Sequence, residues 1–211
     1  MLPTSIDCVP DDDICVYIDE VGRGCLSSIV CAAVVVWPRD YIPLCDEDEK
    51  LLNLIKDSKK LTPKQRDKLD TFIKKTAVEY AIGWIDNDEI DEINILQATF
   101  KAMHVALDKL NTKFDRIVVD GNRFKTYMNK TGDFIPHTCV VNGDNKLLQI
   151  AAASIIAKTY RDNLMIDLHN SDESLMPYKW DKNKGYGTKE HMDAIRKYGI
   201  TRYHRKTFIH I

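Results

Sequence analysis

The 211 residues include 44% hydrophobic and 29% charged residues, and the formal net charge is −2. This composition predicts one ordinary folded unit with an apolar core, and the longest apolar run, residues 29–37, is too short to cross a bilayer. The chain does not open with a basic region followed by an apolar stretch, so we expect no secretory signal and a cytoplasmic protein.

The first part of the chain carries strand signals and then helix signals. Residues 14–18 and 29–37 are rich in β-branched and aromatic side chains and predict neighbouring antiparallel strands joined by a glycine-containing turn. An acidic helix is expected over residues 46–56. Thr62, Pro63 and Gln65 predict a helix that runs to about residue 75, because Thr caps it, Pro suits its first turn and Gln closes a capping box.

The remaining elements mix strands with helices. A strand over residues 78–85 precedes a helix whose apolar side chains recur every three or four residues from Ile93 to Leu110, as a core-facing stripe does. Short strands over 116–119 and 137–141, a buried helix over 145–169 and a last helix from Thr188 to about Tyr198 complete the order.

This order predicts an α/β fold in which helices flank one mixed β-sheet. We expect a single domain over residues 1–211, with a small basic and polar helical segment from about residue 171 onward.

The low net charge hides a local basic region that indicates contact with nucleic acid. Between residues 179 and 206 there are nine basic side chains against three acidic ones. The basic residues are Lys179, Lys182, Lys184, Lys189, Arg196, Lys197, Arg202, Arg205 and Lys206.

The cysteines argue against a structural zinc site. No two of the six are spaced as Cys-x-x-Cys, and several lie in apolar segments. We therefore expect reduced, mostly buried thiols in a reducing compartment. They are Cys8, Cys15, Cys25, Cys31, Cys45 and Cys139.

Four carboxylates share one local context. Each follows an apolar, strand-like run, and glycine lies close by at position 22, 121 or 143. Strands that end at one sheet edge would bring the carboxylates into one cleft, where oxygen ligands suit Mg²⁺ or Mn²⁺ better than zinc. Solvated acids at strand ends are the alternative interpretation. The four are Asp19, Glu20, Asp120 and Asp144.

Six segments, taken in order, resemble the signature segments of ribonuclease HII, and the resemblance covers roughly residues 15–208. They are Asp-Glu-Val-Gly-Arg-Gly at 19–24, Asp-Ser-Lys-Lys-Leu-Thr at 57–62, Val-Asp-Gly-Asn at 119–122, Ala-Ala-Ser-Ile-Ile-Ala-Lys-x-x-Arg-Asp at 152–162, Lys-Gly-Tyr-Gly-Thr-Lys-Glu-His at 184–191, and His-Arg-Lys-Thr-Phe at 204–208.

The resemblance implies a ribonuclease-H-like fold and a divalent-metal-dependent endonuclease. Such an enzyme cuts the RNA strand of RNA–DNA hybrids and nicks 5′ of ribonucleotides embedded in duplex DNA. Metal-activated water would leave a 3′-hydroxyl and a 5′-phosphate. The implied cofactor is Mg²⁺ or Mn²⁺, and the residues that match the family's catalytic, metal-binding acids are Asp19, Glu20, Asp120 and Asp144.

The resemblance also implies how the ribonucleotide is recognised. Gly22, Arg23 and Gly24 match the family's loop that senses the 2′-hydroxyl, the group that distinguishes RNA from DNA. Tyr186 matches the tyrosine that packs on the sugar at the RNA–DNA junction.

Some candidate positions carry two interpretations. Ser58 and Lys59 precede a helix cap and are expected to hold phosphate, with a solvated basic turn as the alternative. Lys158 and Asp162 form an i, i+4 pair that fits an ion pair as well as a substrate contact. His191 has a family counterpart and fits a hydrogen-bonded surface residue equally well.

The chain departs from the family pattern in two segments and in length. The family usually has Ala-Gly-Pro-Val where residues 26–30 read Leu-Ser-Ser-Ile-Val, and often Lys-Gly-Asp where residues 142–144 read Asn-Gly-Asp. The chain ends soon after Phe208, so we expect a monomer without a clamp-binding tail. The alternatives are a non-catalytic hybrid-binding protein and a hybrid nuclease with weak selectivity for single ribonucleotides.

Overall fold

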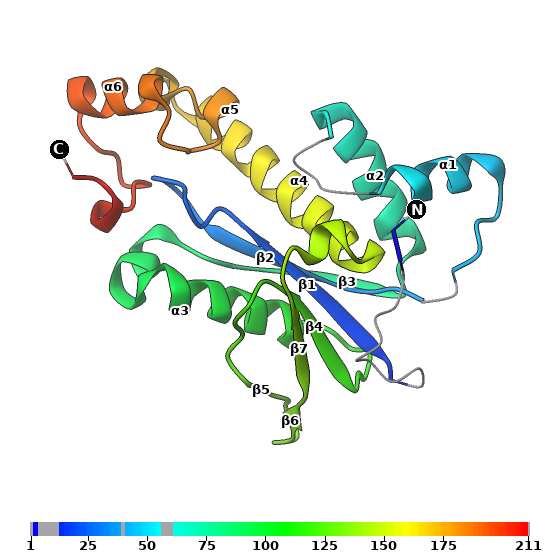
Figure 1. Cartoon of the computed structure of the whole chain (residues 1–211). Coiled ribbons are helices and arrows are strands. Elements are labelled where there is room, and N and C mark those ends of the chain that lie inside the picture. The colour runs from blue at the N-terminus through cyan, green and yellow to red at the C-terminus, as the bar shows by residue number, and fades with distance from the viewer. Residues whose placement is uncertain (1, 4–12, 39–40, 56–60, 211) are drawn as a thin grey trace.

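A five-stranded mixed sheet with the order β3-β2-β1-β4-β7 forms the centre of the computed structural model (Figure 1). The structure describes residues 2–3, 13–38, 41–55 and 61–210. The strands of this sheet are β1 (Cys15–Val21), β2 (Val30–Val36), β3 (Glu79–Ile85), β4 (Arg116–Asp120) and β7 (His137–Val140). A separate two-stranded hairpin joins β5 (Tyr127–Met128) to β6 (Phe134–Ile135).

Helices cover both faces of the sheet, which confirms the predicted fold class (Figure 1). α3 packs against one face, and α4, with α2 beside it, packs against the other. The α-helices are α1 (Asp46–Leu54), α2 (Pro63–Thr76), α3 (Asn87–Asp108), α4 (Leu148–Ser171), α5 (Trp180–Asn183) and α6 (Lys189–Tyr198). The 3-10 helices are η2 (Gly143–Asn145), η3 (Glu173–Tyr178) and η4 (Lys206–Phe208). Among the described residues, none of the helices is long and apolar enough to span a membrane.

The two directions of strand pairing position the functional residues. β1 and β2 pair antiparallel, as do β2 and β3. β1 pairs parallel with β4, with Ile18 opposite Val119, and β4 pairs parallel with β7, with Asp120 opposite Val140. Parallel neighbours end at the same edge of a sheet, so whatever follows β1, β4 and β7 lies close together.

Each face of the sheet buries its own apolar cluster. Alternate residues of a strand face opposite sides, so Ile18 packs with Met103 and Leu107 of α3, whereas Val35 packs on the other side with Ile155 of α4. α4 is buried nearly all round in its first turns, as its composition predicts. The rigid sheet therefore fixes α4, which supplies one wall of the cleft described below.

Local signals for helix ends are confirmed. Thr62 accepts a hydrogen bond from the backbone N–H of Gln65, and the Gln65 side chain accepts one from the N–H of Thr62, which completes the predicted capping box. Thr188 caps α6 in the same way through the N–H of His191.

Several boundaries differ from prediction. α4 begins at Leu148 rather than residue 145, because residues 143–145 form a 3-10 turn. α3 begins at Asn87 and is interrupted at Asn94, whose φ of 67° is not helical. The Asn94 side chain there accepts from the N–H groups of Leu96 and Gln97, so it caps the second half of α3.

The segment from residue 171 onward, for which the sequence predicts a basic and polar surface, also contains buried apolar residues. It contributes an apolar cluster around Trp180, Tyr178 and Ile195, which packs on Met165 of α4. Trp180 is fully buried. The basic side chains therefore belong to a segment whose apolar residues pack against the rest of the fold.

Ser28, in the link between β1 and β2, holds a backbone conformation that favours glycine. Its φ is 67°, and its peptide is fixed because its N–H donates to the carbonyl of Tyr203 and its carbonyl accepts from Arg205. A non-glycine residue in this region carries a steric cost of roughly 1–2 kcal/mol.

Ser28→Gly is expected to raise the free energy of unfolding by about 1 kcal/mol, because glycine removes this steric cost and gives back part of the gain as greater freedom in the unfolded chain. Ser27→Gly is the matched control: Ser27 is equally buried but is not among the described residues with positive φ. The control is expected to lose about 0.5–1 kcal/mol. Urea unfolding of the two variants measures both values, and equal shifts would contradict the assignment of strain to Ser28.

Candidate active site

Asp19 and Glu20 occupy the end of β1 and point to opposite faces of the sheet. The strand runs through both carboxylates to Val21, so they lie within its last residues rather than beyond it. Asp19 is 6% exposed and hydrogen-bonds to Ser154 of α4. Glu20 lies toward α3, where its Oε1 is 3.4 Å from Nη1 of Arg23. One strand end thus supplies acids to both sides of the sheet edge.

Asp120 and Asp144 reach the same edge from β4 and from the turn after β7. Asp120 is the last residue of β4, and its Oδ1 accepts a hydrogen bond of 2.6 Å from the N–H of Gly143. Asp144 is 6% exposed in the 3-10 turn that follows Asn142, whose φ is 55°. This turn brings the chain back against β4.

All four predicted acids line one cleft of about 680 Å³. Its other walls come from α2, α4 and the residues before α6, including Ser154, Lys158 and Tyr186. The structure therefore brings the four acids and Tyr186 together, as the sequence predicts.

Burial and mutual repulsion perturb the paired acids of β1. Burial is the largest cause that raises the pKa of Asp19 well above its ordinary value, and the charges of Glu20 and Asp120 add to it. Burial also raises the pKa of Glu20, although the Arg23 guanidinium partly opposes this. Carboxylates held together against their repulsion are typical of a site that binds a cation.

The donor set fits a hard divalent cation. It consists of carboxylate oxygens, which Mg²⁺ and Mn²⁺ prefer. Across residues 13–38, 41–55 and 61–210, no three His, Cys, Asp or Glu side chains already stand at ligating distance. A cation held here by Asp19, Glu20, Asp120 and Asp144 would therefore draw carboxylates that already share a cleft into closer contact.

Cations on α2 and α4 flank the acids. Lys158 Nζ lies 2.8 Å from Oδ1 of Asp162, so the predicted i, i+4 ion pair is present. Arg66 of α2 bonds to the other oxygen of Asp162 at 3.0 Å. Lys158 also lies 5.7 Å from the centre of the Tyr186 ring. This places positive charge between the acids and the tyrosine.

The two predicted recognition segments, residues 22–24 and 184–187, lie side by side. Cys25 and Tyr186 form an antiparallel bridge, and the N–H of Leu26 donates to the carbonyl of Gly185 at 2.8 Å. Tyr186 is 39% exposed in the cleft, and partial burial raises its pKa to about 12, which keeps the phenol neutral. Residues that are 160 positions apart in the sequence thus form one surface.

Two buried arginines, whose roles the sequence reasoning missed, tie these segments together. Arg161 donates to the carbonyls of Ser27, Ile29 and Lys184. Arg205 donates to the carbonyls of Arg23, Ser28 and Ile29. Both arginines are fully buried. The motifs that contain them are visible in the sequence, but nothing in the pattern shows that backbone carbonyls are their partners.

Arg23 itself is half-exposed and lies beside a smaller hollow of about 320 Å³ on the α3 side of the acids. Glu20 and Asp120 line this hollow as well as the cleft. The floor of the hollow includes Leu96 and Phe100, so the interruption of α3 near Asn94 lies close to it. The acids therefore separate two concave surfaces.

Two further predictions have different outcomes. The surface interpretation of His191 is wrong, because its side chain is fully buried. Ser58 and Lys59 lie outside the described residues, so their predicted phosphate contact stays a prediction.

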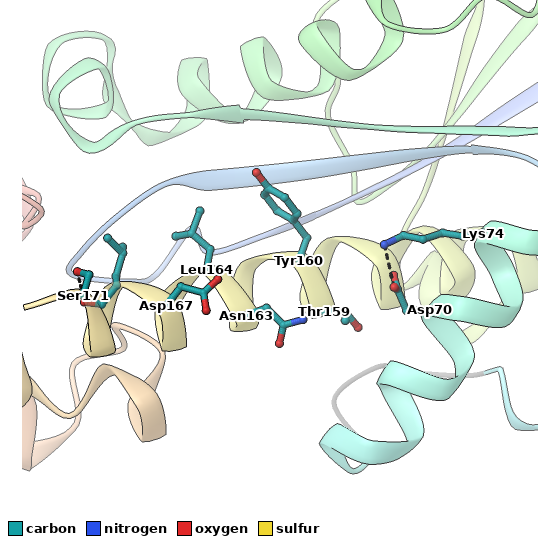
Figure 2. Close-up of a pocket in the computed structure, with 9 residues that line it drawn as sticks. Asp70, Lys74, Thr159, Tyr160, Asn163, Leu164, Asp167 and Ser171 are labelled. Carbon is teal, nitrogen blue, oxygen red and sulfur yellow. Dashed lines mark hydrogen bonds and ion pairs between the residues drawn. The ribbon is translucent and has the colours of Figure 1, made fainter.

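Figure 2 shows a different hollow, of about 530 Å³, between α2 and α4. Tyr160 and Leu164 line it, together with Lys74 and Asp70, which form an ion pair of 2.8 Å. None of the four acids and neither recognition segment contributes to this hollow. It is therefore distinct from the candidate active site.

Solved structures share this fold. The ribonuclease H2 of Pyrococcus horikoshii OT3 superposes with a TM-score of 0.69 and 25% identity, covering 92% of each chain. Bst-RNase HIII, solved in complex with Mn²⁺, gives a TM-score of 0.67 with 18% identity, covering 92% of this chain and 63% of that one. The second likeness shows the fold alone.

Sequence comparison identifies the family. Ribonuclease HII of Bacteroides thetaiotaomicron is 50% identical over 190 residues, which cover 90% of this chain and 86% of that protein. Ribonuclease HII of Christiangramia forsetii is 48% identical over the same length, covering 90% and 87%. The family model described as Ribonuclease HII matches residues 16–211. The family model spans every residue that lines the cleft, and together these matches show that the chain belongs to the ribonuclease HII family.

Proposed function

We propose that this ribonuclease cuts the RNA strand of RNA–DNA hybrids and nicks DNA duplexes on the 5′ side of single embedded ribonucleotides. The observation that carries the proposal is the shared cleft: four carboxylates and Tyr186 line it, and Cys25 and Leu26, which directly follow the Gly22–Gly24 turn, pair with Tyr186 and Gly185. The carboxylates fit phosphodiester chemistry, whereas Tyr186 and the Gly22–Gly24 turn fit recognition of the sugar.

Asp19, Glu20, Asp120 and Asp144 act together as the cation ligands. A divalent cation, Mg²⁺ or Mn²⁺, would supply an activated water and stabilise the leaving oxygen. The protein's own contribution is orientation: Gly143 N–H holds Asp120, and α4 holds Asp19 through Ser154. Carboxylate oxygens alone form this donor set, which supports the choice of a hard divalent cation.

The segment 22–24 selects the nucleotide. A sugar can approach this backbone closely, because Gly24 has no side chain and the space where a Cβ would lie is open, with no atom within 4 Å. A 2′-hydroxyl donates and accepts hydrogen bonds, so exposed backbone groups read it directly. The Tyr186 ring then packs on the neighbouring sugar, because an apolar aromatic face suits a deoxyribose, which has no 2′-hydroxyl. Ser58 and Lys59, outside the described residues, contact phosphate in this proposal.

The alternatives predict different reactions. A non-catalytic hybrid-binding protein would gain nothing from concentrating four carboxylates, which repel phosphate, in the cleft. A nuclease with weak selectivity would cut long hybrids well and single ribonucleotides poorly.

A DNA duplex with one ribonucleotide is expected to be nicked on the 5′ side of that nucleotide with Mg²⁺ or Mn²⁺ and not with EDTA. Asp120→Asn is expected to lower the rate by more than the ~100-fold that loss of even an outer partner of a metal site produces. Asp193→Asn, at an exposed carboxylate that pairs with Arg196, is the matched control and should cut normally. Activity in EDTA, or an unaffected Asp120→Asn variant, would contradict the metal-dependent proposal.

Asp19→Asn is expected to stabilise the metal-free protein at pH 7 while abolishing stabilisation by Mg²⁺. The folded-state pKa of Asp19 is raised, so its contribution to stability is present below the unfolded pKa of about 3.9 and is lost as the pH rises through the folded pKa. Asparagine removes this loss, and each kcal/mol regained raises Tm by ~2–4 °C. Thermal unfolding from pH 3 to pH 8, with and without Mg²⁺, measures the effect, and the advantage of the variant should shrink toward pH 3.

Tyr186→Ala is expected to lower kcat/KM on the single-ribonucleotide duplex by ~10–100-fold, the effect of losing roughly 1–3 kcal/mol of aromatic stacking. Tyr186→Phe keeps the ring and should retain most of the activity, because the neutral phenol is not required to ionise. Steady-state kinetics on the same duplex distinguish the two variants. Equal losses would show that the hydroxyl, rather than the ring, makes the contact.

A further inference from the structure

Two histidines lie fully buried behind Tyr186, and the proposed reaction does not use their side chains directly. His191 belongs to α6, and His204 lies in the segment that follows this helix. Their Nε2 atoms are 3.1 Å apart, and Trp180 Nε1 is 3.1 Å from the Nε2 of His191. Because these nitrogens are buried within hydrogen-bonding distance of one another, one must donate and the other accept at each contact.

The partners at both ends of this chain define the tautomers. A carbonyl only accepts, so the 2.9 Å contact with the Tyr186 carbonyl requires a proton on Nδ1 of His191. The Trp180 N–H only donates, so Nε2 of His191 accepts. The Thr201 N–H donates to Nδ1 of His204 at 2.8 Å, which leaves the proton of His204 on Nε2, so the Nε2 of His191 is an acceptor that the N–H groups of His204 and Trp180 share.

Protonation of either ring would place two donors face to face, so both histidines are neutral. Burial is the main cause that lowers the pKa of His191, and it lowers that of His204 to about 4, with the neighbouring histidine adding to the effect. The aromatic rings of Tyr178 and Trp180 face both histidines. The chain of bonds from Thr201 to Tyr186 is therefore stable at neutral pH.

This series of hydrogen bonds ends at the main-chain carbonyl of Tyr186, the residue whose ring lines the cleft. The Tyr186 carbonyl accepts from both His191 and the N–H of Thr188, and the Tyr186 N–H donates to the carbonyl of Asn183. The preceding Lys184 and Gly185 have φ of 53° and 83°, so the backbone enters Tyr186 through two left-handed residues. A hydrogen bond to its carbonyl therefore has a direct effect on where the ring points.

We propose that His191 is a positioning residue for ribonucleotide selectivity: held by Trp180 and His204, it fixes the Tyr186 carbonyl and so the ring that packs on the sugar at the junction. This inference rests on the proposed function of Tyr186. It assigns His191 no contact with substrate. Its effect should therefore appear at an RNA–DNA junction and be small on a long hybrid, in which the cut site is followed by further ribonucleotides.

Two substitutions test the roles of the two ring nitrogens of His191 separately. His191→Asn places an amide N–H near the position of Nδ1 and can keep the bond to the Tyr186 carbonyl. His191→Gln reaches the position of Nε2 and loses that bond while retaining a partner for Trp180 and His204. His104→Gln is the matched control, because His104 also bonds to a backbone carbonyl, that of Lys125, at the far end of α3.

The measurement is kcat/KM on a single-ribonucleotide duplex divided by kcat/KM on a long RNA–DNA hybrid. His191→Gln is expected to lower this ratio by ~10-fold, because the Tyr186 carbonyl then keeps only the N–H of Thr188 and loses the bond that fixes it to α6. His191→Asn should lower it much less, and His104→Gln should leave it unchanged. Equal ratios for all of these proteins would overturn the inference, as would a greater loss in His191→Asn than in His191→Gln.

Nitrogen NMR of the histidine rings in the unmodified protein tests the same arrangement without a variant that has to fold. The expected spectrum shows His191 protonated on Nδ1 and His204 on Nε2 at pH 7, and a charged ring or the opposite tautomers would overturn the inference. A wild-type protein that fails to nick either substrate would contradict the proposed function instead. The two failures are therefore distinguishable.

Discussion

The parallel pairing of β1 with β4 and of β4 with β7 is the constraint on which the cleft depends. It makes three strands finish at one edge, where Asp19, Asp120 and the turn that bears Asp144 come together. This gathering has a cost, because burial, and after it the charges of Glu20 and Asp120, raise the pKa of Asp19. The apolar clusters on both faces of the sheet offset that cost, because β1 and β2 are almost wholly buried.

Local signals predicted most of the fold, whereas long-range packing decided the rest. The capping residues Thr62 and Thr188 act through neighbours within one turn, so the sequence alone locates both helix starts. The hairpin of β5 and β6 has two residues per strand, too few for a periodic pattern. The start of α4 differs from the prediction because residues 143–145 form a separate 3-10 turn ahead of the helix, and Leu147, in an extended conformation, divides the two.

In the candidate site, too, residues with a local sequence signal were predictable and residues with long-range partners were not. The four acids were predictable because each follows an apolar strand beside a glycine. Arg161 and Arg205 were not, because most of their acceptors are backbone carbonyls that lie 132 to 182 residues away and leave no trace in composition or spacing. His191 was misread for a similar reason: its position on an amphipathic helix says nothing of the Trp180 and His204 rings that enclose it.

The anchoring of the β1–β2 link by two arginines has a consequence for substitutions within the link. Arg161 and Arg205 hold the link through main-chain oxygens, which every amino acid possesses, so these contacts do not depend on which side chains stand at residues 27–29. Gly22 is the exception, because a Cβ at this position would lie 2.4 Å from Nε of Arg161. A change of side chain at Ser27 or Ser28 leaves these carbonyl acceptors in place, whereas loss of either arginine removes three hydrogen bonds to main-chain oxygens at once.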